Sequence, residues 1–146
     1  MSKDIIQTTN APAAIGPYSQ AVRAGSTVYL SGQIGLDPVT GNLREGIEAQ
    51  ARQVIANLKA VAEAAGGSLD DIVKMTLLLA DMADFTTVND HLAKSFTPPY
   101  PARATYQVAA LPKGARVEIE GVLLLQPTAA TAAPGGRSPF DDSKGQ

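Results

Sequence analysis

The sequence predicts an α+β domain in which a mixed sheet of six strands carries two helices. Two helical patterns of apolar residues are separated by a nearly continuous apolar run, and strand-like runs stand before and after them. Apolar residues that recur every three or four positions indicate a helix packed on a core, whereas short runs rich in β-branched and aromatic residues indicate strands. Elements of both kinds in this arrangement are typical of an α+β fold.

The elements are expected in the order strand, strand, strand, helix, strand, helix, strand, strand. The first helix is the clearest, because its apolar residues repeat at intervals of three and four and two glycines, Gly66 and Gly67, are suited to end it. Asp84 is placed to cap the second helix, and Pro98 and Pro99 stop it. The predicted strands are 5–9, 20–23, 27–35, 72–80, 101–110 and 116–125, and the predicted helices are 47–65 and 84–96.

Two helices can cover only one face of such a sheet. The run 72–80 is apolar at almost every position, so it is expected to be a central strand that is covered on both faces. The last strand also has apolar residues in succession, from Val122 to Leu125. Because something must bury the second face, we expect self-association into a closed ring of identical subunits, with clefts between them.

The composition is that of one soluble domain. The chain has 146 residues, of which 45% are hydrophobic and 18% are charged. No apolar run approaches the roughly 20 residues that a membrane-spanning helix needs. The amino terminus lacks the basic region followed by an apolar one that is typical of a secretory signal, so the protein is expected in the cytoplasm. Residues 1–126 are expected to form the domain, and residues 127–146, rich in Pro, Gly and Ala, a tail outside the core.

The residue types limit the possible chemistry. The chain has no cysteine and one histidine, His91, which excludes a thiolate nucleophile and argues against a metal centre built by the protein. His91 lies beside the polar face of the second helix and is expected to be solvated. A net charge of −2 argues against a broad surface for nucleic acid.

Charged residues stand within 101–121, where strands are usually apolar. Arg103 and Thr105 are two residues apart and so share one face of a strand, about 7 Å apart, and Glu118 and Glu120 share a face of the next strand. If the two strands form a hairpin about the turn 111–114, a guanidinium, a hydroxyl and two carboxylates meet on one side of it. This group suits a small-molecule site in which arginine binds a carboxylate and a glutamate activates water. The alternative is a solvent-exposed face of the hairpin, on which Arg103 and the glutamates form only exposed or cross-strand ion pairs.

Two further positions indicate a pocket. Tyr18 follows Gly16 and Pro17 in a loop that can hold an aromatic ring over a ligand, although a tyrosine in a turn also packs simply on a neighbour. Gly32 interrupts the third strand, where it permits the close approach of a ligand or backbone, or only marks a bulge.

Several short motifs, in matching order and spacing, carry a resemblance to a known family. They are Ile15–Ala21, Ser31–Gly35, Val73–Lys74, Asp84–Asn89 and Pro101–Glu120. Over about residues 4–126 the chain resembles the RidA/YjgF family, the reactive-intermediate (enamine/imine) deaminases. The stretch 104–114 is most similar to the eukaryotic branch, and Thr105 stands where many bacterial members have a cysteine.

The resemblance implies a chorismate-mutase-like fold, a homotrimer with sites between subunits, and hydrolysis of 2-imino acids without a cofactor or metal. The expected substrates are 2-iminobutanoate and 2-iminopropanoate, which become 2-keto acids and ammonia. By position, Arg103 would bind the substrate carboxylate and Glu118 would activate water, as the catalytic residues. The substrate-binding residues that the resemblance implies are Tyr18, Ser31, Gly32, Asn89, Arg103, Thr105 and Glu120.

Two other functions stay open at this point. The eukaryotic branch has also been credited with ribonuclease and translation-inhibiting activity, which would require an acidic protein to bind RNA. A trimer that binds small acids or client proteins without turnover, as a chaperone-like module, is the second alternative.

Overall fold

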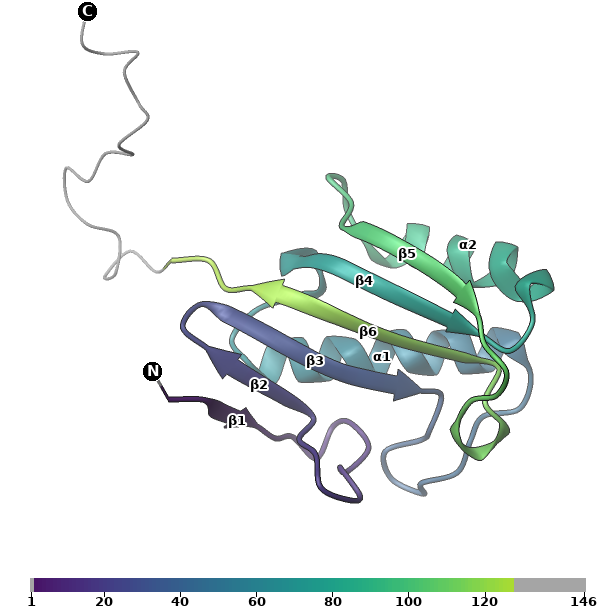
Figure 1. Ribbon diagram of the computed structural model, residues 1–146, viewed down its shortest axis with the longest axis horizontal. Helices are drawn as coiled ribbons and strands as arrows, with labels where there is room; N and C mark the ends of the chain where they lie inside the picture. The colour runs from purple at the N-terminus through teal and green to yellow at the C-terminus, as the bar shows by residue number, and fades with distance from the viewer. Residues whose placement is uncertain (1, 128–146) are drawn as a thin grey trace, which may run out of the picture.

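A computed structural model describes residues 2–127 and shows a six-stranded sheet with both helices on one face (Figure 1). The strand order is β1-β2-β3-β6-β4-β5, and every neighbouring pair is antiparallel except β4 and β5, which are parallel. The predicted mixed α+β sheet is confirmed. The elements are β1 (Asp4–Ile6), β2 (Ala21–Ala24), β3 (Thr27–Ile34), α1 (Ile47–Ala64), β4 (Ile72–Leu79), α2 (Phe85–Ser95), β5 (Ala102–Gln107) and β6 (Val117–Leu124).

The core lies between the two helices and the sheet. Val54, Leu58 and Val61 recur at the predicted helical spacing along α1 and are fully buried. They share the core with Leu77 on β4 and Ile119 on β6, which face the helices from the middle of the sheet. The helix-facing side of the sheet is therefore covered by the chain's own apolar residues.

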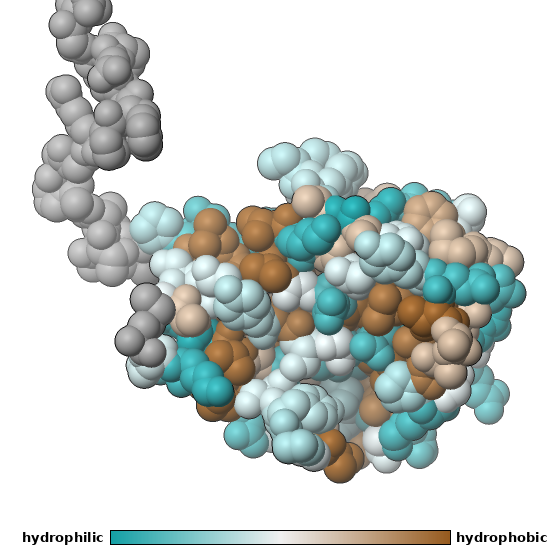
Figure 2. Space-filling view, in the orientation of Figure 1, coloured by the Kyte–Doolittle hydropathy of each residue, from teal (hydrophilic) through white to brown (hydrophobic). Residues whose placement is uncertain are grey.

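The opposite face of the sheet carries no helix in the described part of the chain (Figure 1). Tyr29 lies between the buried Val28 and Leu30 and so points to this face. The strand pairing places Ile5, Tyr106 and Leu124 on the same face, and each of the four is 44–57% exposed. Figure 2 shows this open face, on which apolar side chains lie among polar ones. A single chain thus covers β4 on one face only, which leaves apolar surface of a kind typical of an interface.

The predicted hairpin between the strand of Arg103 and the strand of Glu118 is wrong, because β4 lies between β5 and β6. The connecting segment does not turn back directly but crosses the end of β4, where the Val108 N–H donates to the Leu79 carbonyl and the Ala80 N–H donates to the Arg116 carbonyl. The physical reason is burial. The apolar β4 takes an inner position, and the more polar β5 takes the edge.

The first strand is shorter than predicted and ends at Ile6. Beyond it, the backbone of Thr8 pairs with a side chain: its N–H donates to Gln20 Oε1 at 2.7 Å, and its carbonyl accepts from Gln20 Nε2 at 3.0 Å. Gln20 is buried, and it replaces the strand pairing that would have continued β1. The predicted end of the first helix is confirmed, since Gly66 follows α1 with a left-handed φ of 94°.

Two predicted roles on α2 are wrong. Asp84 precedes the helix but does not cap it, because its carboxylate accepts hydrogen bonds from Arg116 Nε at 3.1 Å and Nη2 at 2.8 Å. The preceding Asp81 accepts a backbone N–H instead. His91 is not simply solvated, since its Nε2 lies 2.5 Å from the Glu48 carboxylate on α1. Both contacts tie α2 to neighbouring elements.

Asn57 is a fully buried polar residue that fastens α1 to the end of β3. Its Nδ2 donates to the carbonyls of Ile34 at 3.2 Å and Leu36 at 3.0 Å, and its Oδ1 accepts from Gln53 Nε2 at 2.8 Å. All its hydrogen-bonding groups are used, which is required for a buried amide.

We expect Asn57→Ala to lower the free energy of unfolding by about 2–3 kcal/mol, because two buried carbonyls would lose their donor. Urea unfolding at a fixed protein concentration measures the change. The control is Asn42→Ala at an exposed position, for which the change should stay below about 0.5 kcal/mol. Equal changes for the two variants would contradict the role of Asn57.

Candidate active site

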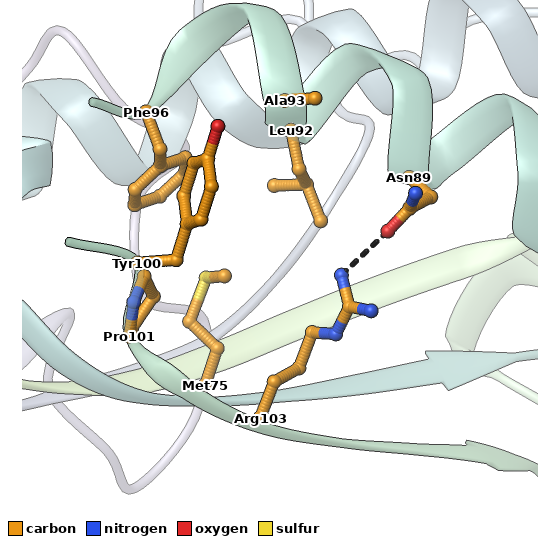
Figure 3. Close-up of a pocket in the computed structure, with 8 residues that line it drawn as sticks. All are labelled: Met75, Asn89, Leu92, Ala93, Phe96, Tyr100, Pro101 and Arg103. Atoms are coloured by element: carbon orange, nitrogen blue, oxygen red, sulfur yellow. Dashed lines mark hydrogen bonds between the residues drawn. The ribbon is translucent and has the colours of Figure 1, made fainter. Parts of the chain in front are cut away.

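Arg103 lies on the edge strand β5 and points toward α2 (Figure 3). Its Nη1 donates to Asn89 Oδ1 at 2.7 Å, and its guanidinium carbon lies 5.3 Å from the centre of the Phe85 ring. Phe85 and Asn89 are four residues apart and so share one face of α2. Neither partner is charged, and within residues 2–127 no carboxylate forms an ion pair with Arg103. The guanidinium is held in place and keeps N–H groups for an anion.

A pocket of about 430 Å³ begins beside this guanidinium (Figure 3). Arg103 and Asn89 form its polar end, and Met75, the β4 partner of Arg103, lies beneath it. The rest of the wall is mostly apolar, apart from the Tyr100 hydroxyl, and comes from α2 and the segment that follows it. These residues are Leu92, Ala93, Phe96, Tyr100 and Pro101.

Glu118 lies on β6 and points to the open face, where its carboxylate lies against Gly32. A Cβ atom at Gly32 would stand 2.2 Å from Glu118 Oε2, so any side chain at that position would displace the carboxylate. The pairing of β3 with β6 shifts register between Leu30 and Gln33, around this glycine. The predicted irregularity of the strand at Gly32 is confirmed, whereas the group that approaches this glycine is the side chain of Glu118 and not the predicted backbone or ligand.

The environment of Glu118 favours its neutral form. Burial raises the pKa of the Glu118 carboxyl above its usual value, and the negative charge of Glu120 raises it further. Both effects penalise the charged carboxylate, the first by removing water and the second by repulsion. A carboxyl group with a raised pKa takes up a proton more readily, which suits a general base.

A second pocket, of about 470 Å³, surrounds Glu118 on the open face and includes Tyr18, Gln20, Gly32 and Lys113. The loop of Tyr18 is anchored by Ser31, whose hydroxyl donates to the Ser19 carbonyl. Ser31 therefore acts on this pocket by holding the loop.

The two groups of residues lie on opposite faces of one sheet. Arg103 is paired with Met75, and Glu118 is paired with Leu78, three residues further along β4. An offset of three residues reverses the face, and it separates the two backbones by about 10 Å along the strands and about 10 Å across them. The predicted meeting of the guanidinium, the hydroxyl and both carboxylates on one side of a hairpin is therefore wrong for one chain. The alternative of cross-strand ion pairs is wrong as well.

The remaining predicted residues divide between the two faces. Thr105 shares the face of Arg103, where it is paired with Leu77, and Glu120 lies exposed beside Glu118. Phe85 is predicted only as part of the apolar stripe, and its support of Arg103 could have been suspected from its spacing of four residues from Asn89.

Among residues 2–127, no three His, Asp or Glu side chains gather in a group that could hold a metal ion.

Comparisons with known proteins agree with this architecture. Residues 8–124 match the family model described as Endoribonuclease L-PSP. The 2-iminobutanoate/2-iminopropanoate deaminase of Bos taurus is 52% identical over 126 residues, which cover 86% of this chain and 92% of that protein.

Solved structures show the same fold. RidA from the Antarctic bacterium Psychrobacter sp. PAMC 21119 is 57% identical, with a TM-score of 0.82 over 84% of this chain and 99% of that chain. E. coli TdcF with bound serine is 43% identical, with a TM-score of 0.80 over 84% of this chain and 99% of that chain. The family match extends over most of the chain, and the sheet order and the two helices on one face have counterparts in these structures. The chain therefore belongs to the RidA/YjgF family.

Proposed function

We propose that this chain is a deaminase that hydrolyses reactive 2-imino acids, 2-iminobutanoate and 2-iminopropanoate among them, to 2-keto acids and ammonia without a cofactor. The observation that carries the proposal is that Arg103 is held in place beside a pocket without a carboxylate partner. Its guanidinium is fixed by Asn89 and Phe85 at the mouth of a pocket, and no carboxylate of the described chain is paired with it. A fixed cation in such a position suits a substrate carboxylate. The deaminase of Bos taurus, 52% identical, is named for this reaction.

The reaction site forms, in this proposal, between two copies in a homotrimer. Arg103 and Glu118 face away from each other in one chain, so one small substrate cannot contact both. If the open face of one copy meets the α2 side of the next, the Glu118 pocket faces the Arg103 pocket. The exposed apolar residues of the open face, such as Tyr29 and Tyr106, favour such an association.

The chemistry requires orientation and one proton acceptor. Arg103 binds the substrate carboxylate through two N–H groups, which places the imine carbon against the Glu118 carboxylate of the neighbouring copy. A water molecule attacks this carbon while Glu118 accepts its proton, and a C–O bond forms as the C=N bond becomes single. Glu118 then passes this proton to nitrogen, which gives an amine and a hydroxyl on the same carbon. The hydroxyl proton is transferred to the amine nitrogen, the C–N bond breaks, and ammonia leaves as the C–O bond becomes the carbonyl of the 2-keto acid.

The other residues support these two groups. Asn89 orients Arg103, Gly32 leaves room for Glu118, and Glu120 raises the pKa of Glu118. Tyr18 forms a wall on the Glu118 side, on a loop that Ser31 holds. Thr105 lies on the face of Arg103, where its hydroxyl is a further hydrogen-bonding group for the substrate.

RNA cleavage is not favoured by the described residues. Glu118 and Glu120 place two carboxylates on the open face of the sheet, and the whole chain has a net charge of −2, which repels a phosphate backbone. Neither described helix is long and apolar enough to cross a membrane. A cytoplasmic location stays a prediction.

We expect Arg103→Ala to lower kcat/KM for 2-iminobutanoate by about 100-fold or more, because the charged contact with the substrate carboxylate is lost. Glu118→Gln should lower kcat by a similar factor, since the amide cannot accept the proton of water. The imine is generated in the assay by an amino-acid oxidase, and the release of keto acid is followed. The controls, Arg52→Ala and Glu45→Gln at exposed positions, should remain within twofold. Unchanged activity in either site variant would refute its role.

The pH dependence should follow the raised pKa of Glu118. Only the carboxylate can accept a proton, so kcat/KM should fall as the pH falls, starting above the usual pKa of a glutamate. Glu120→Gln removes the repulsion and should move this acid limb to lower pH. The measurement is kcat/KM of both forms across the acid limb, with Glu45→Gln as the control. An acid limb that stays in place in Glu120→Gln would contradict the coupling.

Mixing two inactive variants tests whether the site lies between copies. A homotrimer assembled at random from equal amounts of Arg103→Ala and Glu118→Gln chains has both intact residues at about one site in four, so about a quarter of the native activity should return. The control replaces the Glu118→Gln chain with the double variant and should recover nothing. If the first mixture stays inactive although the chains exchange, the shared site is wrong.

A further inference from the structure

We propose that His91 is a positioning residue, whose contact with Glu48 holds α2 in the orientation that fixes Arg103. His91 does not contact the substrate in this proposal but acts through the helix. The inference rests on the proposed function, in which Arg103 binds the substrate carboxylate.

Two contacts that orient the Arg103 side chain come from α2. Its Nη1 donates to Asn89 Oδ1 at 2.7 Å (Figure 3), and its guanidinium carbon lies 5.3 Å from the centre of the Phe85 ring. The strand that carries Arg103, β5, is an edge strand of the sheet. A change in the orientation of α2 would therefore change the position of the guanidinium.

The helix α2 rests on the core through a narrow apolar stripe. It has 11 residues, of which Val88 and Leu92 are buried, whereas α1 has eight buried residues among 18. Successive residues lie about 100° apart around a helix axis, so Asn89 and His91 lie about 80° to either side of the middle of this stripe. Asn89 ties one flank to β5, and His91 ties the other flank to α1. Two ties on opposite flanks hinder rotation of the helix about its axis.

The contact between His91 and Glu48 is close and partly shielded from water. His91 Nε2 lies 2.5 Å from Glu48 Oε2, and the side chains are 16% and 63% exposed. The hydrogen bond from His91 is the largest effect that lowers the pKa of the Glu48 carboxyl below its usual value, so this group accepts as a carboxylate at neutral pH. A contact with such an exposed carboxylate stabilises a fold little, so we expect its main effect on the orientation of α2.

The experiment compares His91→Leu, which removes the donor, with His91→Gln, whose side-chain N–H lies near the position of Nε2. The ligand is 2-oxobutanoate, and calorimetry measures its Kd. His91→Leu should raise Kd by about three- to tenfold while the urea midpoint of unfolding stays near the native value, because a small displacement of Arg103 weakens a directional contact. His91→Gln should stay within twofold. Asp90→Leu, at the neighbouring exposed position of α2, is the matched control and should also stay within twofold.

A double variant tests whether His91 acts through the grip of α2 on Arg103. Asn89→Ala removes the hydrogen bond to the guanidinium, so adding His91→Leu to it should raise Kd no further. In the protein without ligand, the NMR signals of the Arg103 side-chain N–H groups should shift in His91→Leu and stay in place in Asp90→Leu.

An unchanged Kd in His91→Leu would overturn the inference, and so would additive effects in the double variant. An equal rise of Kd in His91→Gln would overturn it too, because the donor would then not matter. If the native protein does not bind 2-oxobutanoate, the proposed role of Arg103 in binding a carboxylate fails. The NMR comparison then decides the inference alone, because it needs neither ligand nor turnover, and unshifted Arg103 signals in His91→Leu would refute it.

Discussion

The alternation of side chains along a β-strand is the constraint on which the site depends. Arg103 and Glu118 are separated by one intervening strand and by an odd number of positions, so the sheet places them on opposite faces. One chain therefore presents two separate surfaces, a fixed cation beside α2 and a half-buried carboxyl group on the open face. The open face also exposes apolar side chains that the two helices do not reach. The proposed association of identical chains would complete both the chemistry and the burial.

Each of the two surfaces is positioned by contacts of its own. On the helix side, α2 is tied to α1 through His91 and Glu48, and its start is tied to the segment before β6 through Asp84 and Arg116. These contacts hold the helix that supports Arg103. At the end of β3, Asn57 on α1 fixes two carbonyls, and on the open face Gly32 admits the Glu118 carboxylate. The protein needs no metal ligand or thiol for either purpose.

The sequence predicts the local elements but not how the strands are ordered, and the roles of the site residues stay predictions. Both helices, the six strands and the glycine ending of α1 follow from periodicity and turn chemistry, which act over a few residues. The hairpin prediction failed because consecutive strands usually pair, and here the burial of the apolar β4 outweighs that tendency. The roles of Asp84 and His91 were missed for a similar reason, since their partners, Arg116 and Glu48, are 32 and 43 residues away.

The separation of the two surfaces has a consequence for how such a protein can change. The wall beside Arg103 comes from α2 and the segment after it, whereas Glu118, the proposed proton acceptor, comes from β6 and lies against β3. In the proposed site, a substitution on α2 can therefore change the shape of the wall beside Arg103 while Glu118 on β6 keeps its position. Substitutions that change substrate binding and substitutions that change the hydrolytic residue can therefore arise separately, which allows related proteins to change their substrates while they keep the same reaction.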